Sequence, residues 1–271
     1  MASSRVQAVI TGASSGLGAV FARKLAGEGC DVVLVARRRG RLEELAAQCR
    51  REYGVEAEVV EADLTREDDL QRVSARVAAL DRLGYLINNA GFGTLGLFHE
   101  ADAAGQENMH RLHVVAPVAL TRAALPGMAA RRGGAVVNVS SVAAFAMNPG
   151  SVSYCATKSW MNSFSEGLYL EMKAAGIPVR VQALCPGFTY TEFHDVVGMD
   201  RSAVPKAWWM TAEEVVAESL RGLRENRLFV IPGVRYRLLA AVLPGLPRPL
   251  RHWLTIRFGS RHRRPLGGGA G

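Results

Sequence analysis

Short apolar runs and longer segments of helical period alternate along most of the chain. Asp31–Ala36 (DVVLVA) is a continuous apolar run, which is typical of a parallel strand buried on both faces. This alternation predicts an α/β fold, a doubly wound parallel sheet with helices on both faces. We expect strands at residues 6–10, 31–36, 57–61, 85–87, 135–140, 179–184 and 228–231, and helices at 16–28, 41–52, 66–80, 106–125 and 152–174, with another beginning at Thr211 in a capping-box-like sequence.

The pattern shows no internal repeat and no second domain. A chain of 271 residues is long enough for one large α/β domain with a substantial core. We therefore predict a single domain at residues 1–232, followed by a basic C-terminal extension at residues 233–271. The glycine-rich end, residues 266–271, is expected to be disordered.

The positive charge is concentrated at the C-terminal end. From Arg221 onward the sequence holds eleven arginines and one acid, Glu225. That surplus of ten exceeds the total net charge of +8, so the first 220 residues carry a net −2. A nearly neutral body argues against nucleic-acid binding. The tail mixes apolar runs with arginines and prolines, which fits either a basic amphipathic helix on an anionic membrane or packing against its own domain or a subunit partner.

Cysteine usage and the N-terminal sequence indicate a cytoplasmic protein. Residues 6–10 lead directly into a glycine-rich loop, so we expect no secretory signal. No apolar stretch reaches the roughly 18 residues of a membrane span. The four cysteines have neither C-x-x-C spacing nor local pairing, which is typical of reduced thiols.

The glycine-rich segment TGASSGLG lies between the first predicted strand and its helix. Gly12, Gly16 and Gly18 in such a turn let backbone N–H groups approach a pyrophosphate, and the helix N-terminus adds positive partial charge. The spacing is G-x-x-x-G-x-G, which differs from the G-x-G-x-x-G fingerprint. The motif lies between a predicted strand and a predicted helix, which favours a dinucleotide site. The alternative is a generic tight turn.

Tyr154 and Lys158 are four residues apart and share one face of a predicted helix. The lysine charge favours the phenolate, which suits proton exchange near neutral pH. Moving a phenol pKa from about 10 to about 7 requires roughly 4 kcal/mol of preferential stabilisation of the phenolate. The alternative is an exposed helix pair with no chemical role.

Several motifs occur together and in a fixed order. They are TGASSGLG, Asp63-Leu64, Asn88-Asn-Ala-Gly91, Ser141, Tyr154-x-x-x-Lys158 and Pro186-Gly187. With this set the chain resembles the short-chain dehydrogenase/reductase family over roughly residues 5 to 232. The resemblance implies a single Rossmann-type domain with sheet order 3-2-1-4-5-6-7, oxidoreductase activity and a homodimer or homotetramer.

The resemblance also assigns cofactor contacts. Asp63 is expected at the adenine amino group, residues 88–91 beside the adenosine ribose, and Pro186 to Thr191 beside the nicotinamide, with Thr191 near its carboxamide. The full set of expected cofactor residues is Gly12, Ser14, Ser15, Gly16, Leu17, Gly18, Arg37, Arg38, Asp63, Leu64, Asn89, Ala90, Gly91, Tyr154, Lys158, Pro186, Gly187, Thr189 and Thr191.

The end of the second strand predicts a preference for NADP(H) over NAD(H). An acid there would bind the ribose 2′-hydroxyl, whereas an arginine accepts a 2′-phosphate. This chain has Ala36-Arg37-Arg38-Arg39 and no acid. The alternative is a solvated basic turn.

By resemblance, Tyr154 is the proton donor to a carbonyl, Lys158 lowers its pKa and holds the nicotinamide ribose, and Ser141 binds the substrate oxygen. Ser140 is expected to be a strand-end residue. The family's usual asparagine is replaced by His113, four residues before Pro117, which cannot donate to the His113 carbonyl. The imidazole either replaces the asparagine, makes the relay pH-dependent near its pKa of about 6.5, or has no chemical role.

The substrate side is predicted to be apolar. Residues 92–99, 143–148 and 188–210 should line it, which favours a bulky hydrophobic carbonyl compound or alcohol. Trp208 and Trp209 either line this pocket or only dock the segment against the body. No histidine has metal-ligand spacing, so no metal is expected. The alternative to an NADPH-dependent reductase is an NADP(H)-binding sensor or scaffold protein with little turnover.

Overall fold

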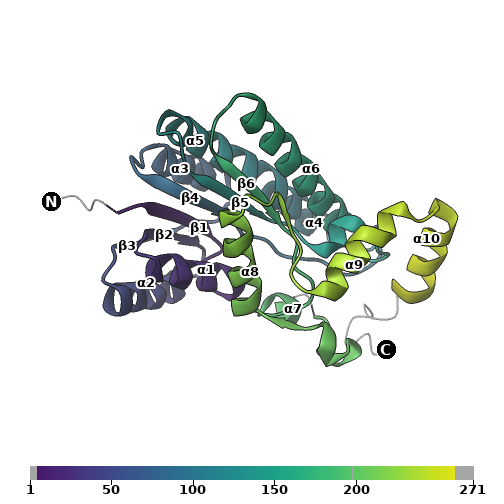
Figure 1. Ribbon diagram of the computed structural model, residues 1–271. Helices are drawn as coiled ribbons and strands as arrows, with labels where there is room; N and C mark the ends of the chain where they lie inside the picture. The colour runs from purple at the N-terminus through teal and green to yellow at the C-terminus, as the bar shows by residue number, and fades with distance from the viewer. Residues whose placement is uncertain (1–4, 197, 260–271) are drawn as a thin grey trace.

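The computed structural model describes residues 5–196 and 198–259. A parallel sheet of seven strands forms its centre, in the order β3-β2-β1-β4-β5-β6-β9 (Figure 1). The predicted Rossmann-type fold and strand order are confirmed, with β9 as the seventh strand of the sheet. The strands are β1 Gln7–Thr11, β2 Asp31–Ala36, β3 Ala57–Glu61, β4 Leu83–Asn88, β5 Ala135–Val139, β6 Arg180–Leu184 and β9 Phe229–Val230.

Helices cover both faces of the sheet and enclose two apolar layers. On one face lie α1 (Gly16–Gly27), α2 (Arg39–Tyr53) and α8 (Ala212–Arg224), with Phe21 and Val216 buried against the strands. On the other face lie α3 (Glu67–Ala78), α5 (Ala116–Ala130) and α6 (Val152–Ala174). Strands buried on both sides explain the continuous apolar runs in the sequence.

The helix that begins after Thr211 has the capping box that its sequence predicts. The Thr211 hydroxyl accepts from the Glu214 backbone N–H at 3.2 Å, and the Glu214 carboxylate accepts from the Thr211 N–H at 2.8 Å. These bonds satisfy backbone groups that the first helical turn leaves unpaired. They fix the start of α8 and therefore its packing against α1.

The long helix expected at residues 106–125 is longer and carries a π-turn. It comprises α4 (Ala103–His110), a π-helical turn η1 (Arg111–Val115) and α5. Pro117 follows the π-turn and has no N–H for a normal helical bond. By length and composition this helix could cross a membrane. Its inner face, with Met109, Leu120 and Met128, is buried in the core.

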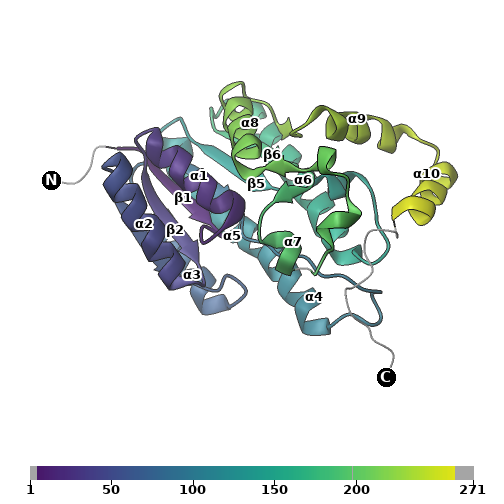
Figure 2. The ribbon, with the colours of Figure 1, turned by 90° about the horizontal axis from the view of Figure 1, so that it is seen from below.

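The C-terminal extension forms helices that project from the body. Helices α9 (Val234–Val242) and α10 (Arg248–Leu254) lie at the end of the molecule opposite α2 (Figures 1 and 2). The prediction of disorder for residues 266–271 lies outside the described residues. The remaining short elements are η2 Val142–Phe145, β7 Thr189–Tyr190, α7 Phe193–Val196, η3 Arg201–Ala203, η4 Lys206–Trp208, β8 Met210–Thr211, η5 Leu243–Gly245 and η6 Thr255–Gly259.

All four cysteines are buried and unpaired. Burial raises the pKa of Cys30 to about 11 and that of Cys185 to about 12, and it also raises the pKa of Cys49. The Cys185 thiol donates to the Asn162 side chain at 3.4 Å. These thiols are core side chains.

Candidate active site

The predicted site residues follow the carboxyl ends of the central strands. In a parallel sheet these ends meet at one edge, where loops from separate strands form a common crevice. The topology therefore brings together the glycine loop after β1, residues 89–91 after β4, Ser141 after β5 and Pro186 after β6.

The glycine loop is packed too closely for side chains. Gly12 has a φ of 65°, and a Cβ there would lie 2.8 Å from the Asn89 amide nitrogen. A Cβ on Gly18 would lie 2.3 Å from the Gly12 carbonyl oxygen. The Asn89 amide donates to the Thr11 carbonyl at 2.9 Å. Asn89 thus holds the loop in shape, and the cradle fits a pyrophosphate that binds backbone N–H groups.

Arg38 is the basic side chain that reaches this loop. Its Nε and Nη2 each donate to the Ser14 hydroxyl at 3.1 Å. Arg37 is instead largely solvent-exposed, at 74% of its side chain, and lies 3.9 Å from the Asp63 carboxylate. Of the two predicted arginines, Arg38 alone contacts the glycine loop.

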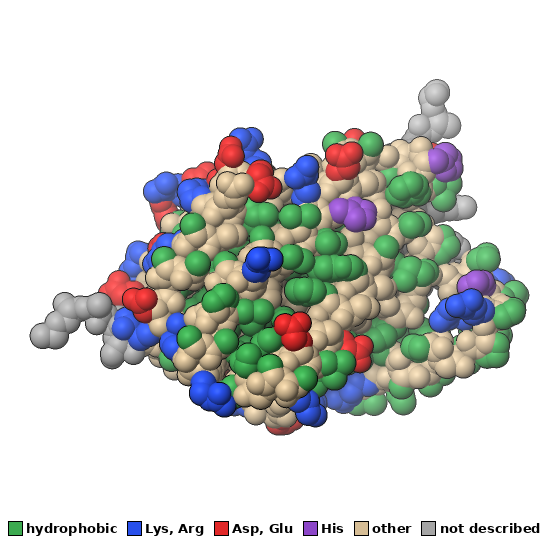
Figure 3. All heavy atoms as spheres, turned by 90° about the horizontal axis from the view of Figure 1, so that it is seen from above, with side chains coloured by type: hydrophobic (Ala, Val, Ile, Leu, Met, Phe, Trp, Pro, Cys, Tyr) green, Lys and Arg blue, Asp and Glu red, His purple; other side chains and the backbone are tan. Residues whose placement is uncertain are grey.

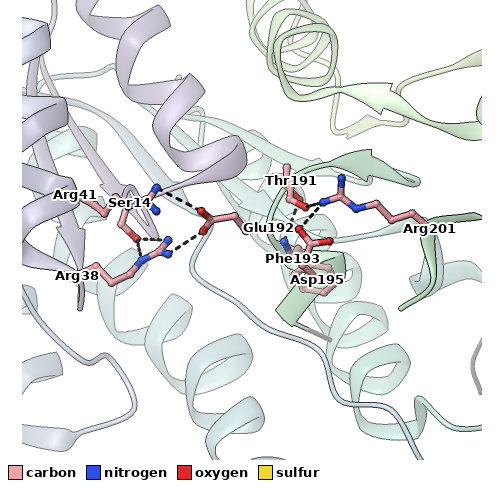
Figure 4. A network of polar contacts seen from close by, with 8 residues as sticks. All are labelled: Ser14, Arg38, Arg41, Thr191, Glu192, Phe193, Asp195 and Arg201. Atoms are coloured by element: carbon pink, nitrogen blue, oxygen red, sulfur yellow. Dashed lines mark hydrogen bonds and ion pairs between the residues drawn. The ribbon is translucent and has the colours of Figure 1, made fainter. Parts of the chain in front are cut away.

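The sequence did not indicate two functional candidates here, Glu192 and Arg41. Glu192, from the segment after β7, binds Arg38 at 2.8 Å and Arg41 at 3.4 Å (Figure 4). The Arg38 guanidinium holds the pKa of Glu192 below its usual range, so the carboxylate is ionised at neutral pH. The three-residue spacing of Arg38 and Arg41 could have indicated a shared helix face. No local signal pointed to Glu192, which lies more than 150 residues from both arginines in the sequence.

A hollow of about 440 Å³ lies on the outer side of the glycine loop, between α1, α2 and α8. Ser14, Gly16, Arg41 and Glu192 line it, whereas Tyr154 and Lys158 do not. It borders only the cofactor end of the site.

Lys158 is buried in α6 beside Tyr154. Its Nζ donates to the Val139 carbonyl at 2.7 Å and lies 5.7 Å from the centre of the Tyr154 ring. Burial lowers the pKa of Lys158 to about 8. The amine is therefore still mostly protonated at neutral pH, close to a half-buried phenol. This is the charge arrangement that favours a phenolate.

The two serines after β5 have different environments. The Ser141 hydroxyl accepts from the Ala143 N–H at 3.1 Å, which orients it at the start of η2. In that bond the Ser141 oxygen is the acceptor, so the bond does not use the proton of the Ser141 hydroxyl. Ser140 is buried, and its hydroxyl donates to the Lys158 carbonyl at 3.0 Å. Ser140 therefore ties α6 to the strand end, as its expected structural role requires.

His113 is completely buried, and both ring nitrogens are hydrogen-bonded. Its Nε2 accepts from the Phe92 N–H at 3.2 Å. Its Nδ1 lies 3.0 Å from the Thr157 hydroxyl, which itself donates to the Tyr154 carbonyl at 3.0 Å. The Thr157 proton is thus used, so the ring is a neutral Nδ1–H tautomer. Burial, reinforced by the nearby Lys158 charge, lowers the pKa of His113 well below its usual value.

The lowered pKa favours the other two roles considered for His113, a replacement for the asparagine or a residue without chemical role, over a relay that titrates near pH 6.5. A Cβ on Gly91 would lie 2.7 Å from the His113 Nε2, so the glycine makes room for the ring. The imidazole meets the Tyr154 ring edge-on, with centroids 5.9 Å apart. His113 connects the loop after β4 to the helix that carries Tyr154.

The segment at residues 188–210 places one aromatic side chain near Tyr154 and uses others for packing. The Phe193 ring lies 5.8 Å from the Tyr154 ring. Trp209 is buried and its indole N–H donates to the Val204 carbonyl at 3.3 Å. Trp208 packs edge-on against Tyr236. Both tryptophans therefore dock the segment, which is the second of the two roles expected for them.

Tyr236 of α9 is the third residue that the sequence did not indicate. Its hydroxyl accepts from the Phe188 N–H at 2.9 Å and donates to the Trp208 carbonyl at 2.5 Å. A Cβ on Gly187 would lie 2.0 Å from the Tyr236 ring, so only glycine permits this contact. Burial raises the pKa of Tyr236 to about 12. The C-terminal extension thus contacts the segment at residues 188–208.

Within the described residues, no group of three or more His, Cys, Asp and Glu side chains could hold a metal ion.

The other predicted cofactor residues lie on the loops at this edge. Asp63 accepts from Thr65, the Thr189 hydroxyl donates to the Gly187 carbonyl, and Thr191 lies over Gly16.

Comparisons with known proteins identify relatives of this arrangement. A family model described as short chain dehydrogenase matches residues 6–201. A very-long-chain 3-oxoacyl-CoA reductase of Anas platyrhynchos is 33% identical over 194 residues, which cover 70% of this chain but only 61% of that protein. A short-chain dehydrogenase of Sphingobium yanoikuyae in complex with NADPH has a TM-score of 0.81 at 39% identity, covering 89% of this chain and 94% of that one. A bulky-bulky ketone specific alcohol dehydrogenase of Comamonas testosteroni has a TM-score of 0.78 at 34% identity, covering 90% and 94%.

Proposed function

Because this chain belongs to the short-chain dehydrogenase family and is an oxidoreductase, we propose that it reduces the carbonyl group of a hydrophobic small molecule, or oxidises the matching alcohol. The observation that carries the proposal is the buried Lys158 ammonium beside the half-buried Tyr154, bonded to the end of the strand that Ser141 follows. Their position at the carboxyl edge of the sheet, beside the glycine loop, supports this proposal.

The bound nicotinamide cofactor supplies or accepts the hydride. Tyr154 donates its proton to the carbonyl oxygen, and the Lys158 charge stabilises the resulting phenolate. The Ser141 hydroxyl donates to the same oxygen as negative charge develops on it. His113 and Thr157 hold the loop after β4 and the Tyr154 backbone in position. Burial lowers the pKa of His113, which favours the neutral imidazole in this positioning role.

NADP(H) is the proposed cofactor. The support is Arg38, which is held at the glycine loop by Ser14, with Arg41 on the same side and no acid at the end of β2. Arginine guanidinium groups bind phosphate through charge-assisted hydrogen bonds. The related Sphingobium structure contains NADPH. Glu192 now occupies both guanidinium groups, so a 2′-phosphate must compete with it.

A bulky apolar ketone is the proposed substrate class. Phe193 and the aromatic segment around it supply apolar surface beside Tyr154. Two relatives, a very-long-chain 3-oxoacyl-CoA reductase and a bulky-bulky ketone specific alcohol dehydrogenase, support the same class. The sensor alternative had the His113 replacement as its one support, and a histidine with both ring nitrogens hydrogen-bonded fits a positioning role in a working reductase.

We further propose a homodimer formed through α5 and α6, in the cytoplasm. An apolar groove of about 380 Å³ lies between these helices and is lined by Val118, Leu125, Phe164 and Leu168. Outward-facing apolar side chains on helices in a soluble protein mark interaction surfaces.

The direct test is consumption of NADPH by the purified protein with a panel of bulky ketones, beside the Tyr154→Phe variant. Turnover that disappears in the variant supports the proposal. NADPH binding without turnover of any ketone, in wild type and variant alike, would overturn it in favour of a cofactor-binding sensor.

A further inference from the structure

Helices α9 and α10 expose an apolar surface at the end of the molecule. Tyr236 is the one buried side chain that these two helices contain. Val234, Leu238 and Trp253 are 62%, 61% and 58% exposed. Figure 3 shows hydrophobic side chains, with basic ones among them, over this projecting end. The exposed large apolar residues of this tail surface are Val234, Leu238, Leu239, Val242, Leu250, Trp253 and Ile256.

The same surface is strongly basic. Arg248, Arg251 and Arg257 lie on α10 and the turn that follows, and the sequence has no acid after Glu225. Nearer the body, Arg237 is paired with Glu218 at 2.9 Å. The positive charge therefore increases away from the domain, where exposed apolar side chains are also found.

We propose that the tail surface binds an anionic lipid bilayer. Helices that combine exposed apolar residues with arginines lie in the interfacial region of membranes, and each basic residue adds attraction to anionic lipids. Trp253 suits this position, because an indole has an apolar body and a polar N–H. Apolar burial and charge attraction thus act together at one surface.

The charge pattern favours lipid over a second copy of the chain. In a two-fold contact the same patch faces itself, which would bring the arginines of both copies together with no acid on either tail. Like charges in such an interface repel. An anionic bilayer instead neutralises them.

The anchor of α9 determines what a bound membrane would face. Tyr236 fixes α9 to Phe188 and Trp208, which belong to the proposed substrate segment. The substrate end of the crevice would therefore lie toward the bilayer, and α2 with the cofactor phosphate end toward water (Figure 2). This consequence rests on the proposed function, whereas lipid binding itself does not.

The test is flotation of the full-length protein with vesicles of phosphatidylcholine alone and of phosphatidylcholine with 30% phosphatidylglycerol. We expect binding to the anionic vesicles that weakens with salt. The Arg248→Gln/Arg251→Gln variant should bind about thirty-fold more weakly, given the contribution of each basic residue near such a surface. Trp253→Ala should also bind at least about tenfold more weakly, through lost apolar burial.

The matched control is Arg51→Gln/Arg66→Gln, which removes equal charge from exposed residues in the last turn of α2 and just before α3. It should bind as wild type does. Equal loss in the control would show attraction by net charge alone and would overturn the proposal. Absence of wild-type binding to anionic vesicles at low salt would also overturn it. So would light scattering in which Trp253→Ala lowers the molecular mass, since the tail surface would then be a subunit interface. Ketone turnover in detergent, measured in parallel, reports separately on the proposed function.

Discussion

Lys158 keeps an ammonium group where burial favours the neutral amine. Its partner is a backbone carbonyl and not a carboxylate, so the charge is only partly compensated. Such a site destabilises the fold in exchange for a charge beside Tyr154, as is common at catalytic positions. His113 shows the opposite solution, because it stays neutral and has both nitrogens paired.

The Lys158→Met variant is expected to be more stable than wild type at pH 7 and inactive. Lowering the lysine pKa from 10.5 to about 8 corresponds to roughly 3 kcal/mol of destabilisation. The lost bond to Val139 offsets about 1–2 kcal/mol of the gain. Because the folded pKa is below the unfolded pKa, the penalty is full below pH 8 and disappears as the pH rises toward 10.5.

Chemical denaturation of both proteins at pH 7 and pH 10.5 measures this difference. The gain in the free energy of unfolding should be present at pH 7 and lost at pH 10.5. A variant that is less stable than wild type at pH 7 would contradict this account of Lys158.

Glu192→Gln is expected to tighten NADPH binding. The carboxylate competes with a 2′-phosphate for Arg38 and Arg41, so its removal should lower the Kd for NADPH about three- to tenfold and leave the Kd for NADH within about twofold. Fluorescence titration with both cofactors measures the change. Glu213→Gln, an exposed acid that lines the same hollow, is the control. If Glu192→Gln weakened the binding of NADPH and of NADH equally, the main role of Glu192 would be to anchor its own segment.

At the scale of elements, most helices and strands were predictable because their local patterns agree with their burial. The glycine loop, the Tyr154–Lys158 helix and the Thr211 cap all follow from short-range spacing. The π-turn before Pro117 was not predicted, since it depends on how the long helix packs. Glu192 and Tyr236 were not predicted either, because their partners lie far away in sequence.

Tyr236→Ala should loosen the contact between α9 and the segment at residues 188–210. It removes both hydroxyl bonds and the ring packed over Gly187, and we expect a local loss of about 2–4 kcal/mol. Limited proteolysis should then cut this segment faster, and KM for the ketone should rise more than kcat falls. Tyr236→Phe keeps the ring and should show a smaller effect. Unchanged proteolysis in the alanine variant would show that α9 is not needed to hold the segment.

At the scale of the whole molecule, the fold separates its surfaces by task. The crevice lies at the carboxyl edge of the sheet, the apolar groove lies on α5 and α6, and the tail surface projects from one end. The groove shares α6 with the crevice, and α9 of the tail contacts the crevice through Tyr236. Outward-facing side chains of the groove and the tail can nevertheless be changed at residues other than those that form the crevice.

Val118→Arg tests the proposed dimer. An arginine in the apolar groove would place a charge in the interface, and the mass from light scattering should fall from that of a dimer to that of a monomer. Tyr53→Arg is the control, because both parent side chains are 38% exposed. A dimer that persists in Val118→Arg places the interface elsewhere.

The burial of all four cysteines has a practical consequence. A thiol must be exposed and deprotonated to react with a maleimide, and burial opposes both at Cys30 and Cys185. A single cysteine introduced on the surface should therefore take up a dye without any native cysteine having to be removed. One fluorophore on α10 and another dye on a vesicle or cofactor analogue would make the distances between these surfaces measurable by energy transfer.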